Sequence, residues 1–177
     1  FATSYIPTVA SAVTRSADYL AVSYFNNVNK QSDGNTVVAD FDILGGKTEN
    51  VPDSRQHIFY TDGLINSYYS MFIYTPSGAG QFQWFNGDSA SYAFGKTKIP
   101  IPLQKYRMLM TKKGTIATGY IDGVQVTQNT TTTEQILGTA PRLIVGSREN
   151  STRALFGHIS NFRIFDKALT ATEVALV

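Results

Sequence analysis

Short runs of alternating or mostly apolar residues recur along the chain, and turn-forming residues separate them. Eleven runs are expected to be strands, over residues 18–25, 36–44, 55–61, 67–75, 81–85, 91–94, 104–111, 115–121, 124–128, 141–147 and 157–165. Asp-Gly, Gly-Gly, Lys-Gly and Asn-Gly-Asp steps end several of them, as is typical of tight turns between antiparallel strands. Strands spaced by roughly 8–12 residues indicate an all-β sandwich or barrel.

The end of the chain carries the one helical signal. Thr170 is followed by Glu173 at the third position, which is the spacing of a capping box and predicts a short helical turn. In the strand before it, alternation places Phe162 and Ile164 on one face and Arg163 on the other.

Size and composition narrow the class of protein. A length of 177 residues without an internal repeat or linker suits one domain, residues 1–177. The net charge of +2 lacks the dense basic stripe of a nucleic-acid-binding surface, so no nucleic-acid partner is expected. No apolar run is long enough to predict a membrane span. The absence of Cys excludes disulfides and thiolate chemistry.

Asp40 and Asp42 are the nearest approach to a catalytic or metal-binding motif. Two positions apart on a strand, they share a face. Retaining glycoside hydrolysis requires two carboxyl groups about 5 Å apart, and the glutamates that usually supply them are missing here, so no catalytic residue is assigned. The same pair is the candidate calcium site, since carboxylate oxygens suit calcium, and Asp122 and Asp166 are further candidate ligands. No other cofactor is expected, because His57 and His158 lack the paired spacing of a transition-metal site.

Aromatic residues gather between positions 67 and 94. Alternation cannot bury all of them on one face, so Phe72, Phe82 and Phe94 are expected in the core and others on the surface. Exposed aromatic rings can stack against sugars while neighbouring amides and carboxylates hydrogen-bond the hydroxyls. The candidate carbohydrate-binding residues are Trp84, Asn86, Asp88, Tyr92 and Tyr68. A second candidate surface is the loop "SRENSTR", with Arg148, Glu149, Asn150 and Arg153.

The last third of the chain has a more specific pattern. An aromatic residue precedes an Asp-Gly hairpin in "TGYIDGVQV", a strand ending in Gly follows in "PRLIVGS", and "LFGHISNFRIFDKALTATEV" comes last. This pattern resembles the end of a concanavalin A-like jelly-roll domain of the laminin-G-like group. The resemblance implies an antiparallel two-sheet β-sandwich with a short C-terminal helical turn. The matching residues are Tyr120, Asp122, Gly123, Gly146, Gly157, Ile159, Arg163, Ile164, Phe165, Asp166, Ala168, Leu169, Thr170, Glu173 and Val174.

The opening stretch, "TSYIPT" followed by "AVTRSAD", resembles a segment at the start of such domains in bacteriophage structural proteins, especially tail fibres. Pro7 fixes a backbone dihedral and removes a donor, which suits an entry or edge strand. The resemblance implies a location in the virion, or otherwise outside the cell. It also implies surface glycans or other virion proteins as partners, and a homo-oligomer such as the trimer usual in phage fibres.

Three functions follow from these observations. The first is a non-catalytic module of a phage structural protein that attaches to host surface glycans, and an exposed Trp84 and Tyr92 would favour it. The second is a structural virion module for capsid decoration or fibre assembly, which a large flat apolar patch would favour. The third is a polysaccharide hydrolase or lyase, which acidic residues clustered in a cleft would favour.

Overall fold

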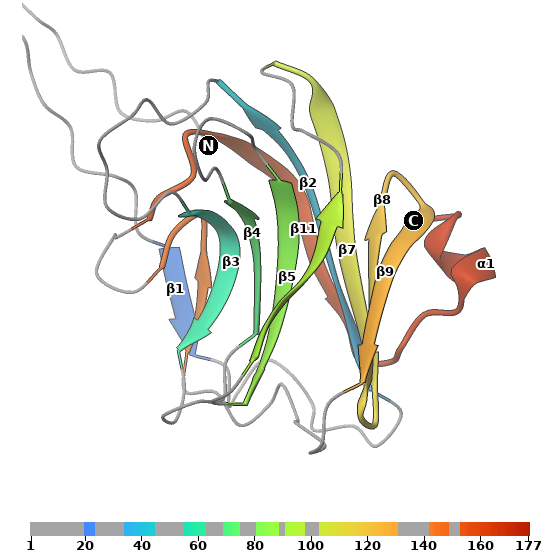
Figure 1. Ribbon diagram of the computed structural model, residues 1–177. Coiled ribbons are helices and arrows are strands. Elements are labelled where there is room, and N and C mark those ends of the chain that lie inside the picture. Colours follow the sequence, from blue (N-terminus) through green and yellow to red (C-terminus); the bar gives the residue numbers. More distant parts are fainter. Residues whose placement is uncertain are drawn as a thin grey trace, which may run out of the picture.

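The computed structural model describes residues 20–23, 34–44, 55–62, 69–74, 81–88, 91–97, 103–130, 142–148 and 153–177. Within these ranges the chain forms eleven strands and one short helix. The strands pair into two antiparallel sheets that lie face to face, as Figure 1 shows. The architecture is that of a jelly-roll sandwich, as the sequence predicts.

One sheet has six strands in the order β1-β10-β3-β4-β5-β6. The consecutive strands β3 to β6 form a meander, and β10 returns from late in the sequence to lie between β1 and β3. The strands are β1 (Leu20–Ser23), β10 (Arg142–Val145), β3 (Arg55–Asp62), β4 (Tyr69–Tyr74), β5 (Gln81–Asp88) and β6 (Ser91–Thr97).

The other sheet has five strands in the order β11-β2-β7-β8-β9. Strand β11 pairs with β2, so this sheet also joins segments that are distant in the sequence. Its strands are β11 (Gly157–Phe165), β2 (Asn35–Ile43), β7 (Lys105–Lys113), β8 (Ile116–Ile121) and β9 (Val124–Thr130). The β8–β9 turn has Asp122 and Gly123 at φ +50° and +80°, the backbone that an Asp-Gly hairpin requires.

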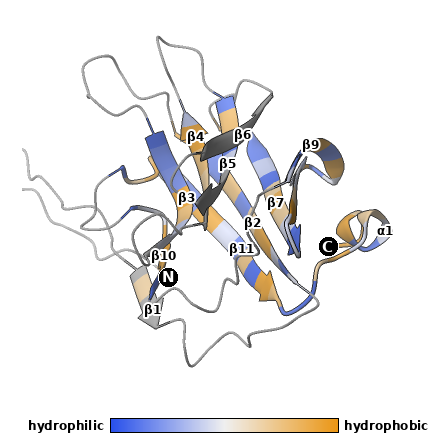
Figure 2. Cartoon of the chain, turned by 60° about the horizontal axis from the view of Figure 1, so that its bottom comes forward, coloured by the Kyte–Doolittle hydropathy of each residue, from blue (hydrophilic) through white to orange (hydrophobic). Residues whose placement is uncertain are grey.

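The core lies between the sheets, and strand alternation fills it. On β2, Ala39 and Phe41 point into the core, whereas Asp40 and Asp42 point outward. Figure 2 shows polar and apolar residues following one another along the strands. Both acidic residues therefore share the outer face, as the sequence predicts.

Trp84 is fully buried in this core, with none of its surface exposed. Its indole Nε1–H donates to the carbonyl oxygen of Leu109 at 2.9 Å. Gly119 faces the ring so closely that a Cβ atom added there would lie 2.8 Å from two indole carbons. The missing side chain of Gly119 thus makes the space that Trp84 occupies.

The helix α1 (Ala171–Val174) packs outside the five-stranded sheet, beyond β8 and β9 (Figure 1). Thr170 caps it by accepting from the Glu173 backbone N–H, and the Glu173 side chain accepts from the Thr170 backbone N–H. This confirms the predicted capping box. A second apolar cluster beneath the helix contains Val38, Leu109, Tyr120, Leu169 and Val174.

The eleven predicted strands match the eleven strands of the described ranges. The prediction of a turn at Asn86-Gly87-Asp88 is wrong, because β5 continues through Asp88, which pairs with Ser91 of β6. Phe82 lies in the core as expected, whereas Phe72 is buried on the outer side of its sheet. In the part of the chain that the structure describes, no helix has the length and apolar character needed to cross a membrane.

Candidate functional site

Aromatic rings and arginines meet on the outer face of the six-stranded sheet. On β4, Met71 and Ile73 belong to the core, so Ser70, Phe72 and Tyr74 point away from it. The neighbouring strand β3 places His57 beside Phe72. We name this cluster the arginine face. Its half-buried members are Arg55, Tyr74, Arg148 and Arg153, and its buried members are His57, Tyr60 and Phe72.

A bulge in β3 determines which of its residues reach this face. The register with β4 shifts between His57 and Phe59, so that Ile58 and Phe59 both enter the core. Arg55 and His57 before the bulge, and Tyr60 after it, then lie on the outer side. Strict alternation would have placed Phe59 on the same face as His57.

Aromatic rings support two of the guanidinium groups. The Arg55 guanidinium carbon lies 5.8 Å from the ring centroids of both Phe72 and Tyr74. The Arg148 guanidinium carbon lies 5.2 Å from the centroid of Tyr60. These distances are in the range of cation–π interactions, which hold a cation in place through the ring face.

His57 is buried beneath these groups. Its ring stacks on Phe72 with centroids 5.1 Å apart, and its Nδ1 lies 2.7 Å from the Ser70 Oγ. The Ser70 hydroxyl donates its only hydrogen to the Phe59 carbonyl oxygen at 3.0 Å. The Ser70 oxygen must therefore accept from His57 Nδ1–H, which leaves Nε2 as an acceptor. Nε2 is buried without a hydrogen-bond partner among the described residues.

The surroundings keep this imidazole neutral. Burial lowers the pKa of His57 well below its ordinary value of 6.5, and the positive charges of Arg153, Arg148 and Arg55 lower the pKa further. All three arginines of the face therefore act on one side chain.

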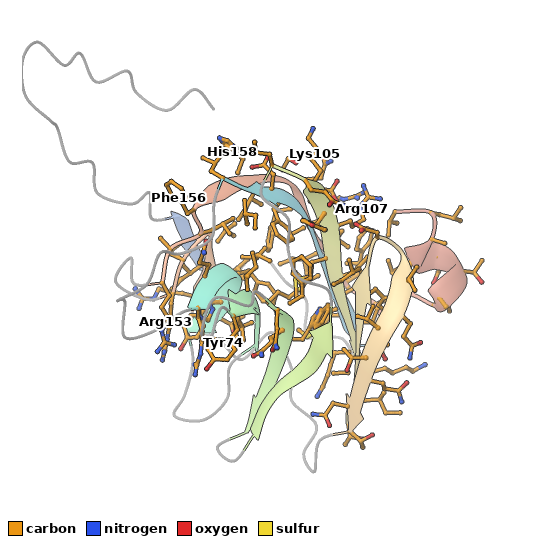
Figure 3. The ribbon with its side chains drawn as sticks, turned by 45° about the horizontal axis from the view of Figure 1, so that its top comes forward. Tyr74, Lys105, Arg107, Arg153, Phe156 and His158 are labelled. Carbon is orange, nitrogen blue, oxygen red and sulfur yellow. The ribbon has the colours of Figure 1, made fainter. Side chains whose placement is uncertain are left out.

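Backbone hydrogen bonds hold the loop that carries Arg148 and Arg153. Gly146 N–H donates to Ile58 O at 2.8 Å, and His57 N–H donates to Arg153 O at 2.9 Å. The two ends of the loop are also joined, because Leu155 N–H donates to Gly146 O at 2.7 Å. Two arginines distant in sequence from β3 are thus fixed beside it. Figure 3 shows Arg153 and Tyr74 on the β3 side of the molecule.

On the outer face of the five-stranded sheet, an arginine is paired with a carboxylate. Arg107 donates to both carboxylate oxygens of Asp40, at 2.6 and 2.8 Å, and also to the backbone oxygen of Val177. Asn161 Nδ2 donates to the same carboxylate at 2.9 Å. These hydrogen bonds, that from Arg107 above all, lower the pKa of Asp40. A pocket of about 400 Å³ lies here, with Lys105 and Asp122 also in its lining.

The distribution of acidic side chains separates the two faces further. Five acidic side chains are described, and all belong to the five-stranded sheet, its hairpin turn or the C-terminal segment: Asp40, Asp42, Asp122, Asp166 and Glu173. We take the arginine face as the candidate site because aromatic rings and guanidinium groups meet there.

The prediction that Trp84 is an exposed platform is wrong, because the indole is enclosed in the core and its N–H is bonded to the backbone. Asn86 and Asp88 lie on β5 and Tyr92 lies on β6, but their side chains are outside the described part of the structure. Tyr68 and Asn150 are outside the described residues altogether.

The loop named in the sequence contributes Arg148 and Arg153 to the arginine face, whereas Arg55, His57, Tyr60 and Tyr74 were not anticipated. The sequence "RQHIFY" does not predict that these side chains share a face, because no residue in it indicates the bulge between His57 and Phe59.

The candidate calcium ligands have other partners. Asp40 is held by Arg107, and Asp42 Oδ1 lies 2.9 Å from His158 Nδ1 (Figure 3 labels Arg107 and His158). Among the described residues, no three or more His, Asp or Glu side chains are grouped to hold a metal ion. A calcium ion on this pair would have to compete with the Arg107 guanidinium, and calcium binding stays a prediction.

The sequence of residues 46–175 matches the family model Laminin_G_3, described as the concanavalin A-like lectin/glucanases superfamily. The chain belongs to this family. Comparison with curated protein sequences gives no match.

Solved structures with the same fold include three that are distant in sequence. One is a SAP-like pentraxin from Limulus polyphemus, with TM-score 0.62 and 12% identity over 81% of this chain and 68% of that one. Another is the Ruminococcus gnavus IT-sialidase CBM40 bound to α2,3-sialyllactose, with TM-score 0.58 and 12% identity over 81% and 82%. The third is the NanB sialidase of Streptococcus pneumoniae, with TM-score 0.58 and 19% identity over 89% of this chain. The match spans only 26% of NanB.

Proposed function

We propose that this chain is a non-catalytic carbohydrate-binding module, and that the arginine face holds the sugar. The observation that carries the proposal is that the ring of Tyr74 and the guanidinium groups of Arg55, Arg148 and Arg153 are half-buried on the outer side of a lectin-like sandwich. Tyr74 is half-buried and offers a ring for the apolar side of a sugar, while arginine N–H groups donate to sugar oxygens. Both features are typical of sites that bind carbohydrate in proteins.

Similar structures support a glycan as the ligand. The CBM40 domain of R. gnavus, which shares this fold, is bound to sialyllactose. At 12% identity this likeness concerns the fold alone. The support for the site therefore comes from the residues of this chain.

The described carboxylates support a binding role without hydrolysis. Retaining hydrolysis requires two carboxyl groups about 5 Å apart on either side of the scissile bond. The described acidic side chains lie away from the arginine face, and Asp40 is engaged by Arg107. Among the described side chains of the arginine face, none is a carboxylate that could serve as the acid or the nucleophile.

A glycan array with the purified domain tests the proposal, and the Tyr74→Ala variant tests the place of binding. Phe165→Ala is the matched control, because Phe165 is also half-buried under an arginine, Arg163, but lies on the other sheet. We expect specific glycan binding that Tyr74→Ala weakens about tenfold or more and Phe165→Ala leaves unchanged. Binding that survives Tyr74→Ala but is lost in Phe165→Ala would place the site on the five-stranded sheet. Repeating the measurement with a chelator tests the calcium prediction.

A specific observation also favours assembly with another protein. Leu44, Leu103 and Phe156 are 42%, 72% and 61% exposed at one end of the sandwich. Backbone hydrogen bonds hold them close together, from Leu44 N–H to Phe156 O and from Leu103 N–H to Ile43 O. Clustered exposed apolar residues are typical of protein–protein contacts. Light scattering would measure whether the domain forms an oligomer. A monomeric domain that also binds no partner through these residues would contradict this alternative.

We further propose that the glycan is on a bacterial surface and that the parent protein belongs to a phage particle, as its attachment component. This part of the proposal rests on the resemblance of the opening segment to bacteriophage structural proteins. Residues 1–19, which include that segment, lie outside the described structure. Binding to bacterial surface polysaccharides, in preference to other glycans on the array, is the expected result.

A further inference from the structure

We propose that the pocket on the outer face of the five-stranded sheet is a second ligand site, which holds one ring of a neutral, hydroxyl-rich sugar. This pocket and the arginine face belong to different sheets, so the second site goes beyond the proposed function and does not depend on it. Three features of the pocket support it: the walls, a hydrogen-bonded network and a bulge in β11.

Segments that are distant in the sequence form the walls of the pocket. Its volume is about 400 Å³, within the roughly 300–1,000 Å³ of small-molecule sites. The turn between β8 and β9 lies against the end of α1, since a Cβ atom added to Gly123 would lie 3.9 Å from the Cα atom of Ala175. The lining comes from β7, this turn, β11 and α1, and includes Lys105, Arg107, Gly123, Asn161, Val174 and Ala175.

A network of paired charges forms one side of the pocket. Arg107 donates through Nε and Nη2 to the two carboxylate oxygens of Asp40, and Asn161 Nδ2 donates to one of them. The bidentate geometry fixes the guanidinium and the carboxylate, and the two groups neutralise each other. The side chains of Arg107 and Asp40 are still 37% and 18% exposed. The network is therefore preorganised and accessible without carrying a net charge.

The network has hydrogen-bonding capacity left for a ligand. A guanidinium has five N–H donors, of which Arg107 uses two for Asp40 and one for the backbone oxygen of Val177. The Asn161 amide must donate to the carboxylate, and its Oδ1 is an acceptor without a partner among the described residues. Lys105 (Figure 3) is exposed, and its ammonium has no partner in the described part of the chain. Donors and acceptors thus lie together, and a sugar hydroxyl is both.

A bulge in the edge strand β11 completes the network. The pairing with β2 shifts by one residue after Ser160. Ile159 and Phe162 both pack against the core. The two polar residues between them therefore lie on the outer face, whereas regular alternation would turn Asn161 inward. Asn161 has φ +50°, a left-handed backbone that asparagine adopts more readily than most residues. Bulges often redirect a side chain beside a functional site, and the side chain redirected here reaches Asp40.

The charges of the pocket favour a neutral ligand. Arg107 and Asp40 neutralise each other. The other charged residues in the described lining are Lys105 and Asp122, one of each sign. An ion would therefore meet a group of like charge as well as one of opposite charge. The neighbouring hydroxyls of a sugar ring match adjacent donors and acceptors, and the exposed Ala175 offers an apolar contact to the ring C–H groups.

Protein-observed NMR on the isotope-labelled domain tests the inference. The probes are the methyl glycosides of glucose, galactose, mannose and N-acetylglucosamine, with glycerol as a polyol that lacks a ring. We expect at least one glycoside to shift the Asn161 side-chain amide signal saturably, with a dissociation constant of about 1 mM, and glycerol to leave it in place. The absence of this signal from the Asn161→Gly variant assigns it.

Asn161→Gly removes the amide but suits the φ of +50°, so the bulge is retained. Followed at the Gly123 backbone amide, this variant should bind about fivefold or more weakly, as for loss of a hydrogen bond. Arg163→Gln is the matched control and should leave binding unchanged, because Arg163 is exposed on the same strand but outside the pocket lining. If Asn161→Gly does not fold, Lys105→Ala removes an exposed donor and should also weaken binding about fivefold or more.

Four results would overturn the inference. No saturable shift with any glycoside would show that the pocket is not a sugar site, and the proposed function, which Tyr74→Ala tests, would stand. Glycoside binding that Tyr74→Ala abolishes and Asn161→Gly leaves unchanged would place the sugar on the arginine face alone. Equal shifts with glycerol would show a contact without selectivity for a sugar ring. Shifts with acetate or phosphate only, lost in Lys105→Ala, would make the ligand an anion.

Discussion

Replacing Trp84 with Ala should destabilise the domain severely. The indole is completely buried, and a tryptophan buries roughly 150–250 Å². At about 25 cal/mol per Å² this area corresponds to ~4–6 kcal/mol, and the measured range for such truncations in cores is about 3–5 kcal/mol. The hydrogen bond from Nε1 to Leu109 O adds about 1 kcal/mol. We expect a loss of about 4 kcal/mol in the free energy of unfolding, a large share of the roughly 5–15 kcal/mol typical of domains.

Urea unfolding followed by far-ultraviolet circular dichroism measures this loss. Circular dichroism is needed because Trp84 is the one tryptophan of the chain, so its removal also removes the intrinsic fluorophore. Trp84→Phe is the control variant, since it keeps an aromatic ring in the core but loses the N–H donor, and about 1–2 kcal/mol is expected for it. An unchanged m-value would show that the unfolded states are comparable.

A buried Trp84 and an exposed Trp84 predict opposite results for the Trp84→Ala variant. A buried Trp84 predicts that Trp84→Ala loses stability. An exposed sugar platform predicts that Trp84→Ala keeps stability within about 1 kcal/mol and loses glycan binding. The second result would refute the placement of β5 against the core.

Three further predictions concern packing, acid and the C-terminal helix. Gly119→Ala should destabilise the domain by about 1–3 kcal/mol in the same urea assay, since its Cβ would press on the Trp84 ring; an unchanged midpoint would contradict this contact. As the pH falls below about 6.5, stability should fall with a slope approaching ~1.4 kcal/mol per pH unit, because His57 in the unfolded chain binds a proton that the folded form excludes. A His57→Gln variant should lack this slope, and a slope that persists in it would assign the effect to other groups. Thr170→Ala should cost about 1 kcal/mol through loss of the cap to Glu173, seen as a lowered Tm, whereas Thr170→Ser should be nearly neutral.

The sequence was sufficient for the strands and for the Asp122-Gly123 turn, but not for the end of β5, which continues through the turn expected at Asn86-Gly87-Asp88. Alternation in β2 and the Asp122-Gly123 step depend on neighbouring residues only, so local pattern predicts them. The pairing of β11 with β2, and of β10 with β1 and β3, depends on contacts between distant segments. Local pattern carries no signal for such pairings, and the resemblance to a known family supplied the two-sheet arrangement instead.

The site was harder to predict for two physical reasons. Alternation correctly places Phe82 and Trp84 on one side of β5, but it does not say which side faces the other sheet. In β3 a single extra residue at the bulge changes which of His57 and Phe59 faces outward. The sequence shows that Arg148 and Arg153 belong to a polar loop. It does not show that this loop lies beside β3, because that contact depends on the folded sheet.

The closed loop between Gly146 and Leu155 has an evolutionary consequence. Its ends are joined to each other and to β3 by main-chain hydrogen bonds, which depend little on the side chains in between. The intervening positions, including Arg148 and Arg153, can therefore be substituted while the strands keep their register. If the arginine face binds the ligand, as proposed, exchanges within this loop would alter binding without changing the pairing of the strands. We therefore expect this loop to vary more among related domains than the strands that hold it.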